Sequence, residues 1–190
     1  MVMRYLDTDT LLCWAPEHPT TSQVLEMEVD SDGRKRESLR DVQIKTAQPI
    51  ISYLSTHIWP GAEIYPATDE DSIIPRSQPQ MTKDIIRGWT SGLPAYELAG
   101  LERAVLAGKG LLAAVRLLVE WSPAYRHLRP EENKVDLKRF GVEEAAHAAS
   151  LEVAWQTGVW GEVEDTHDVE KEDLRRQLGS VILLVADQEA

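Results

Sequence analysis

Five side chains that are able to bind a metal ion lie close together near the end of the chain: Glu162, Glu164, Asp165, His167 and Asp168. Carboxylate oxygens and one imidazole are suitable ligands for a divalent cation. The segment lacks the HExxH pattern and the twelve-residue calcium loop, and Glu164 with His167 supplies one Glu-x-x-His pair where a dinuclear centre needs two. Two interpretations therefore remain: a metal site, or an acidic start of the final helix, where the helix dipole favours carboxylates.

The acidity of the protein is concentrated around these residues. Positions 143 to 173 hold ten Asp or Glu and one Lys, a local balance of −9 in a chain whose net charge is −12. A nucleic-acid partner requires a Lys/Arg surface for its phosphates, so this class of partner is excluded. The acidic region is suited instead to a protein partner that carries Arg or Lys.

Other patterns that could support catalysis or cofactor binding fail on spacing. Seven residues separate Gly100 from Gly108, whereas a phosphate-binding loop needs four, and Lys109 is followed by glycine rather than Ser or Thr. Cys13 is the single cysteine, which rules out an internal disulfide, and no nucleophile elbow surrounds it. We therefore expect no enzyme activity and no cofactor, with Cys13 packed in the core.

Three polar or aromatic residues recur at helical spacing before the acidic segment. Glu152, Gln156 and Trp160 stand at i, i+4 and i+8, which places a carboxylate, an amide and an indole on one face of a helix. This combination favours recognition of a partner, because aromatic residues anchor interfaces and carboxylates orient basic groups. The alternative is that Trp160 belongs to the core. The core side is expected to include Leu151, Val153, Ala154, Trp155 and Val159.

The elements that must position these residues are mostly helical. Apolar residues at helical spacing predict a mainly α fold of five or six helices, with a small extended or β component at 8–14 and 63–66. Ser38 is the expected N-cap of the first helix, and Pro49 should break or kink it. The expected helices are 39–59, 79–89, 94–121 as one helix or as two joined near Gly108 to Gly110, 142–160, and 169–186.

Small residues form a stripe on the most apolar of these helices. Gly100, Ala104 and Gly108 stand at i, i+4 and i+8, so a second helix could approach closely there, which would offset the low helix propensity of glycine. The longest apolar run, 111–119, is interrupted by Arg116 and is too short to span a bilayer. We therefore expect no membrane insertion.

Four segments resemble the ATP-twelve family, the assembly chaperones that hold the alpha subunit of the ATP synthase catalytic head before it joins the beta subunit. The similarity is greatest to fungal members. It implies a function without chemistry, in the mitochondrial matrix for organellar members. The segments are TDTLLCWAPE (8–17), DVQIKTAQPIISYL (41–54), LPAYELAGLERAVLAGKGLLAAVRLLVEW (93–121) and LEVAWQTGVWGEVEDTHDV (151–169).

The resemblance also implies a domain division and a binding site. Family members carry a β-rich domain and, in organelles, a transit peptide before the Thr8 motif, whereas this chain starts seven residues before it. We expect residues 1–37 to be the remnant of that domain plus a polar loop, 38–190 to be the helical chaperone domain, and the protein to be a monomer. The alternative function is a metal-dependent enzyme that uses Glu162 to Asp168. The implied partner-binding residues are Glu152, Gln156, Trp160, Gly161, Glu162 and Glu164.

Overall fold

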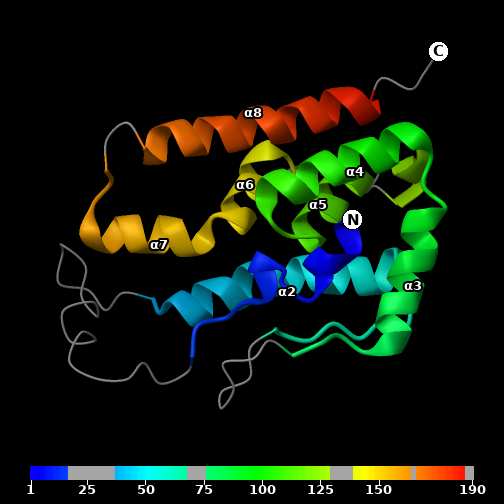
Figure 1. Cartoon of the computed structure of the whole chain (residues 1–190), viewed down its shortest axis with the longest axis horizontal. Coiled ribbons are helices and arrows are strands. Elements are labelled where there is room, and N and C mark those ends of the chain that lie inside the picture. Colours follow the sequence, from blue (N-terminus) through cyan, green and yellow to red (C-terminus); the bar gives the residue numbers. More distant parts are fainter. Residues whose placement is uncertain (17–36, 68–75, 129–138, 164–165, 187–190) are drawn as a thin grey trace.

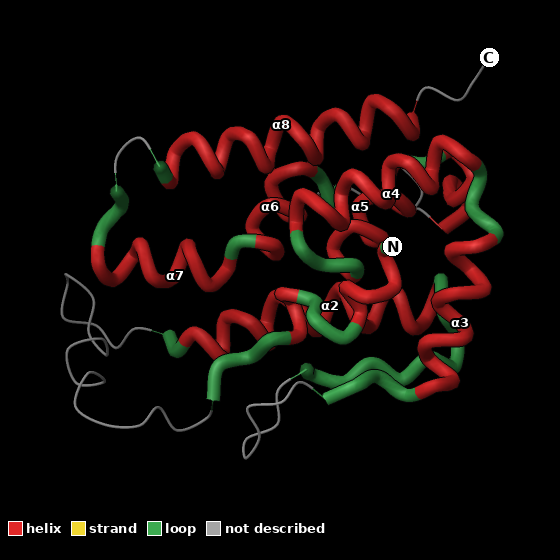
Figure 2. The backbone as a smooth tube through the Cα atoms, in the orientation of Figure 1, coloured by secondary structure: helices red, strands yellow, loops and turns green. Residues whose placement is uncertain are grey.

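Helices form all the regular secondary structure in the described part of the chain, as the computed structural model shows (Figures 1 and 2). The structure describes residues 1–16, 37–67, 76–128, 139–163 and 166–186. The predicted mainly α fold is therefore confirmed. In chain order the elements are the 3-10 helices η1 (Val2–Leu6) and η2 (Thr10–Leu12), α2 (Leu39–His57), α3 (Gln80–Ser91), α4 (Ala95–Gly108), α5 (Leu112–Trp121), the 3-10 helix η3 (Pro123–Leu128), α6 (Val142–Ala149), α7 (Leu151–Trp160) and α8 (His167–Ala186).

Helix α5 lies at the centre of the core. Eight of its ten residues are buried, including Leu117 and Leu118, and it packs against α2, α4, α6, α8 and η3. Such a helix must be apolar on nearly every side, which explains why its sequence shows no wide polar face. Its buried carboxylate, Glu120, is paired with Arg116 at 2.7 Å.

Helix α8 packs along α4 at Gly100, the first residue of the small-residue stripe that the sequence predicts, whereas Gly108 faces Ala149 of α6. A Cβ atom placed on Gly100 would lie 2.8 Å from Val185 Cγ1 and 3.4 Å from Val181 Cγ1, which is shorter than normal contact. Ala104 is also buried. Glycine at position 100 is therefore required for α8 to lie this close to α4.

A buried carboxylate joins the N-terminal segment to the turn between α4 and α5. Asp9 accepts hydrogen bonds from the backbone N–H of Leu11 (2.9 Å), Leu111 (2.6 Å) and Leu112 (2.8 Å), so it caps both η2 and α5. Burial raises the pKa of Asp9 to about 6, against the opposing effect of these three amides. A Cβ on Gly110 would lie 2.6 Å from Asp9 Oδ1, so the turn needs glycine there.

The predicted extended or β component is wrong for the described residues, because side chains satisfy the backbone groups that a neighbouring strand would satisfy. Gln78 donates to the carbonyl of Tyr65 at 2.7 Å and accepts from its N–H at 3.0 Å. The hydroxyl of Thr82 likewise donates to the carbonyl of Glu63 and accepts from its N–H. Near the N-terminus, the Asp9 cap stabilises the 3-10 turn η2 where a strand was expected.

Two predicted helix boundaries also change. Ser38 caps α2 as expected, with its hydroxyl oxygen accepting from Asp41 N at 3.1 Å, but Pro49 does not break the helix. The single helix expected at 142–160 is two, because the chain leaves helical geometry at Ser150 (φ −118°, ψ 18°). The Ser150 hydroxyl donates to the Ala146 carbonyl at 2.8 Å, a local bond that competes with helix continuation. The break gives seven α-helices in the described ranges instead of five or six.

The close approach of α8 to α4 can be tested by making the same substitution at two helical glycines. Gly100→Ala should lower the free energy of unfolding by about 1 to 3 kcal/mol, because its Cβ overlaps the stiff side chain of Val185. Gly88→Ala in α3 should raise it by up to about 1 kcal/mol, because a Cβ there meets no neighbour and alanine favours the helix. Urea unfolding of both variants measures the difference. Equal effects at the two positions would contradict this packing.

Candidate functional site

Helix α7 carries three exposed apolar residues, Val153, Ala154 and Trp160, while Trp155 and Val159 are half-buried. Among its ten residues Leu151 is the one that is buried, and Val153, 45% exposed, stands two positions later. The helix packs along α2 and lies apart from α8, to which a short connection leads (Figure 1). Trp155 Nε1 donates to the carbonyl of Glu37, just before α2, at 3.2 Å. An apolar helix with this little burial is typical of a surface that binds a partner.

The predicted binding face of α7 points to solvent. Glu152 is exposed, and its Oε1 atom accepts a hydrogen bond from Gln156 Nε2 at 3.1 Å, so the two side chains lie side by side. Trp160, one turn later, is 66% exposed. Of the two roles that the sequence left open for this tryptophan, the structure places it outside the core.

Gly161 and Glu162 shape the end of α7. Gly161 has φ 88° and ψ 161°, a conformation that side chains essentially forbid, and its N–H donates to the Thr157 carbonyl at 2.8 Å. The turn that ends the helix therefore explains why position 161 is glycine.

Glu162 is exposed and forms an ion pair with Lys171 of α8 at 2.6 Å. The hydrogen bond and charge of Lys171 lower the pKa of Glu162. The remaining predicted site residue, Glu164, lies outside the described residues.

The described side chains of the acidic segment do not form a metal site. No group of three or more His, Cys, Asp or Glu converges in the described ranges. Glu162 is paired with Lys171. His167 Nδ1 accepts a hydrogen bond from Val163 N at 3.0 Å, so the ring proton is on Nε2 and no lone pair is free for a metal. Asp165 lies outside the described residues.

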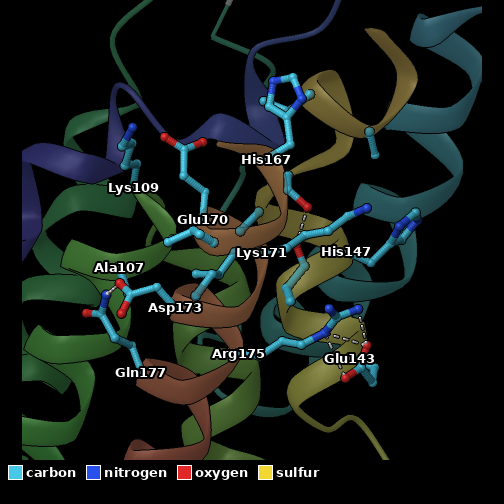
Figure 3. A pocket seen from close by; sticks show the side chains of 18 of the residues that line it. Ala107, Lys109, Glu143, His147, His167, Glu170, Lys171, Asp173, Arg175 and Gln177 are labelled. Carbon is cyan, nitrogen blue, oxygen red and sulfur yellow. Dashed lines mark hydrogen bonds and ion pairs between the residues drawn. The ribbon is translucent and has the colours of Figure 1, made fainter. Parts of the chain in front are cut away.

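A groove of about 790 Å³ opens between α6, α7 and α8, and the C-terminal end of α4 closes one side of it (Figure 3). Ala146 and Ala149 of α6 and Val169 and Leu174 of α8 contribute apolar surface. Above this surface, Arg175 of α8 reaches Glu143 of α6 with two hydrogen bonds from its guanidinium, each 3.0 Å, and so ties the two helices together. This ion pair thus links two of the three helices that line the groove.

The α7 wall of this groove includes two residues that the sequence assigned to the core. Val153 and Ala154 are exposed and line the groove with Thr157, one turn along the helix. Of the five expected core residues, the prediction is confirmed for Leu151 and wrong for the exposed Val153 and Ala154. Helical periodicity identifies an apolar side of α7, but this pattern is the same whether that side meets a neighbouring helix or an open groove.

Two curated proteins are similar to the chain along almost its whole length. The chain is 28% identical over 189 residues to "Protein ATP12, mitochondrial" of Saccharomyces cerevisiae. The matched region covers 98% of the chain and 53% of that protein. It is 26% identical over 183 residues to "Protein atp12, mitochondrial" of Schizosaccharomyces pombe, covering 96% of the chain and 51% of the relative. Both relatives are ATP12 proteins, so the chain is similar to the ATP12 family.

The chain spans about half the length of the curated relatives that it matches. No family model and no solved structure matches it. None of the described helices has both the length and the apolar character needed to cross a membrane.

The exposure of Trp160 predicts that this side chain contributes little to folding. Trp160→Ala should change the free energy of unfolding by no more than about 0.5 kcal/mol, as is usual for surface substitutions. Trp59→Ala, the matched change at a fully buried tryptophan, should cost about 3 to 5 kcal/mol. Thermal or urea unfolding of both variants measures this contrast. A loss at Trp160 comparable to that at Trp59 would place Trp160 in the core after all.

Proposed function

We propose that this chain is an assembly chaperone that binds the unassembled alpha subunit of ATP synthase and protects it until the beta subunit joins. The observation that carries the proposal is the exposed apolar helix α7, with Trp160 at its end and carboxylates beside it. The two relatives support it through their family, and their names place them in mitochondria. We assign this chain to the mitochondrial matrix on the same grounds.

The chemistry of α7 is suited to holding a subunit that lacks its partner. A free subunit exposes an apolar interface that aggregates unless another surface covers it. Trp160 offers a large rigid anchor for such an interface, while Glu152 and Glu162 attract basic groups at its edge. A chaperone must later release its client, so we expect an interface of moderate size and a monomeric chaperone.

The groups that might act in catalysis have structural roles, which favours a chaperone over an enzyme. Asp9 is buried as a cap for α5. Cys13 packs against the core, and burial raises the pKa of its thiol, so the reactive thiolate is disfavoured. His167 and Glu162 are engaged by Val163 and Lys171. No described contact favours the metal-dependent enzyme that the sequence left as an alternative.

Reversing the charge of Glu162 tests the proposed client and site together. Glu162→Lys, alone and combined with Glu164→Lys, should fold normally, because Glu162 is exposed and its ion pair is screened by water. Both variants should lose capture of isolated alpha subunit in a co-purification assay, because the reversed charge repels basic groups of the client.

The matched control is Glu102→Lys on α4, which changes the net charge equally at a position away from α7. This control should capture the alpha subunit as well as the unmodified chain does. Unchanged capture by the Glu162 variants would show that the site is wrong. Absence of capture by the unmodified chain would refute the proposed function.

A further inference from the structure

The groove between α6, α7 and α8 offers an apolar surface with no neighbour in the described structure. Val153 and Ala154 line it from α7, and Val169, which is 63% exposed, lines it from α8. Together with the α6 alanines these residues form the apolar part of the groove lining. Exposure of so much apolar surface to water is unfavourable, and an incoming apolar side chain would relieve it.

Most polar side chains of the groove form hydrogen bonds or ion pairs with neighbouring side chains. Arg175 binds Glu143 and Glu172, and Lys171 binds Glu162. Asp173 accepts a hydrogen bond from Gln177 on its own helix (Figure 3). These pairs leave the apolar walls as the main surface that a ligand can use. A groove of this kind is suited to one side of a polypeptide segment rather than to a highly polar small molecule.

The charge that remains on α7 and α8 is negative, and Lys109, just after α4, is an exposed cation in the groove lining. Glu152 on α7 and Glu170 on α8 are exposed, and neither lies within ion-pair distance of a cation among the described residues. The surrounding segment, 143–173, carries a balance of −9. A segment that enters the groove is therefore attracted if basic residues flank its apolar side and repelled if acidic residues do.

We infer that this groove binds an amphipathic segment of the client, with its apolar side between α7 and α8 and with flanking Lys or Arg residues near Glu152 and Glu170. The inference rests on the proposed function for the identity of the client. It extends that function by adding a second contact surface, which is distinct from Trp160 at the end of α7 and which Glu162 borders. Two apolar residues one helical turn apart on the segment would meet Val153 and Thr157, which have the same spacing on α7.

Filling the groove tests this inference. Ala154 is exposed on the groove wall, so Ala154→Trp should fold normally while it occupies the space that the segment needs. Leu183→Trp is the matched control, because Leu183 is 75% exposed near the far end of α8 and does not line the groove. The dissociation constant for isolated alpha subunit should rise at least about tenfold in Ala154→Trp and stay within about twofold in the control.

A photo-crosslinking residue at position 157, compared with one at position 183, identifies the occupant. We expect position 157 to crosslink an alpha-subunit segment that has an apolar side and basic flanks. Crosslinks to a second copy of this chain or to the chain itself would overturn the inference. Capture that survives Ala154→Trp but is lost in Glu162→Lys would also overturn it, and would leave the proposed function intact.

The groove can also be tested without the alpha subunit. A synthetic amphipathic peptide of Leu and Lys should bind the unmodified chain, and Ala154→Trp should weaken this binding, whereas a peptide of Leu and Glu should not bind. If the chain fails to capture alpha subunit but binds the Leu/Lys peptide in this way, the client is wrong and the groove chemistry is right. Equal binding of both peptides, or binding of neither, would contradict the inference.

Discussion

The close packing of α8 on α4 is the contact on which the rest of the arrangement depends. Gly100 removes the side chain that would collide with Val185, so α8 lies directly on α4 and covers the central helix α5. The Arg175–Glu143 ion pair then fixes α6 beside α8. Helix α8 is held on this side of the molecule, and α7 lies apart from it (Figure 1).

The separation of α7 from α8 explains how an apolar helix stays exposed on a folded protein. Leu151 and contacts with α2 hold the start of α7, and Gly161 turns the chain back toward α8. The side of α7 that carries Val153 therefore meets the groove, and Trp160 meets water. The core and the helix pair α4–α8 supply the stability of the fold, so α7 remains available to bind a partner. A chaperone needs this combination, because it must present apolar surface without unfolding.

The sequence predicts the features that depend on local chemistry. The Ser38 cap and the close helix contact at Gly100 of α4 follow from residue type and spacing alone, and the structure confirms both. The sequence could not show the break at Ser150, where a hydrogen bond of the serine hydroxyl competes with helix continuation. It also could not show that the side chain of Gln78 takes the place of a strand partner. Nor could it show which apolar residues of α7 lack a neighbour, because exposure depends on the path of a helix distant in sequence.

The central claim is that α7 is held available for a client by a scaffold that does not need it. Amide hydrogen exchange, followed with and without isolated alpha subunit, tests this claim most directly. In the free chain, the amides of α7 should exchange much faster than those of α4 and α8, and the alpha subunit should slow exchange in α7 selectively. Exchange in α7 that is as slow as in α4, and unchanged by the alpha subunit, would contradict the account.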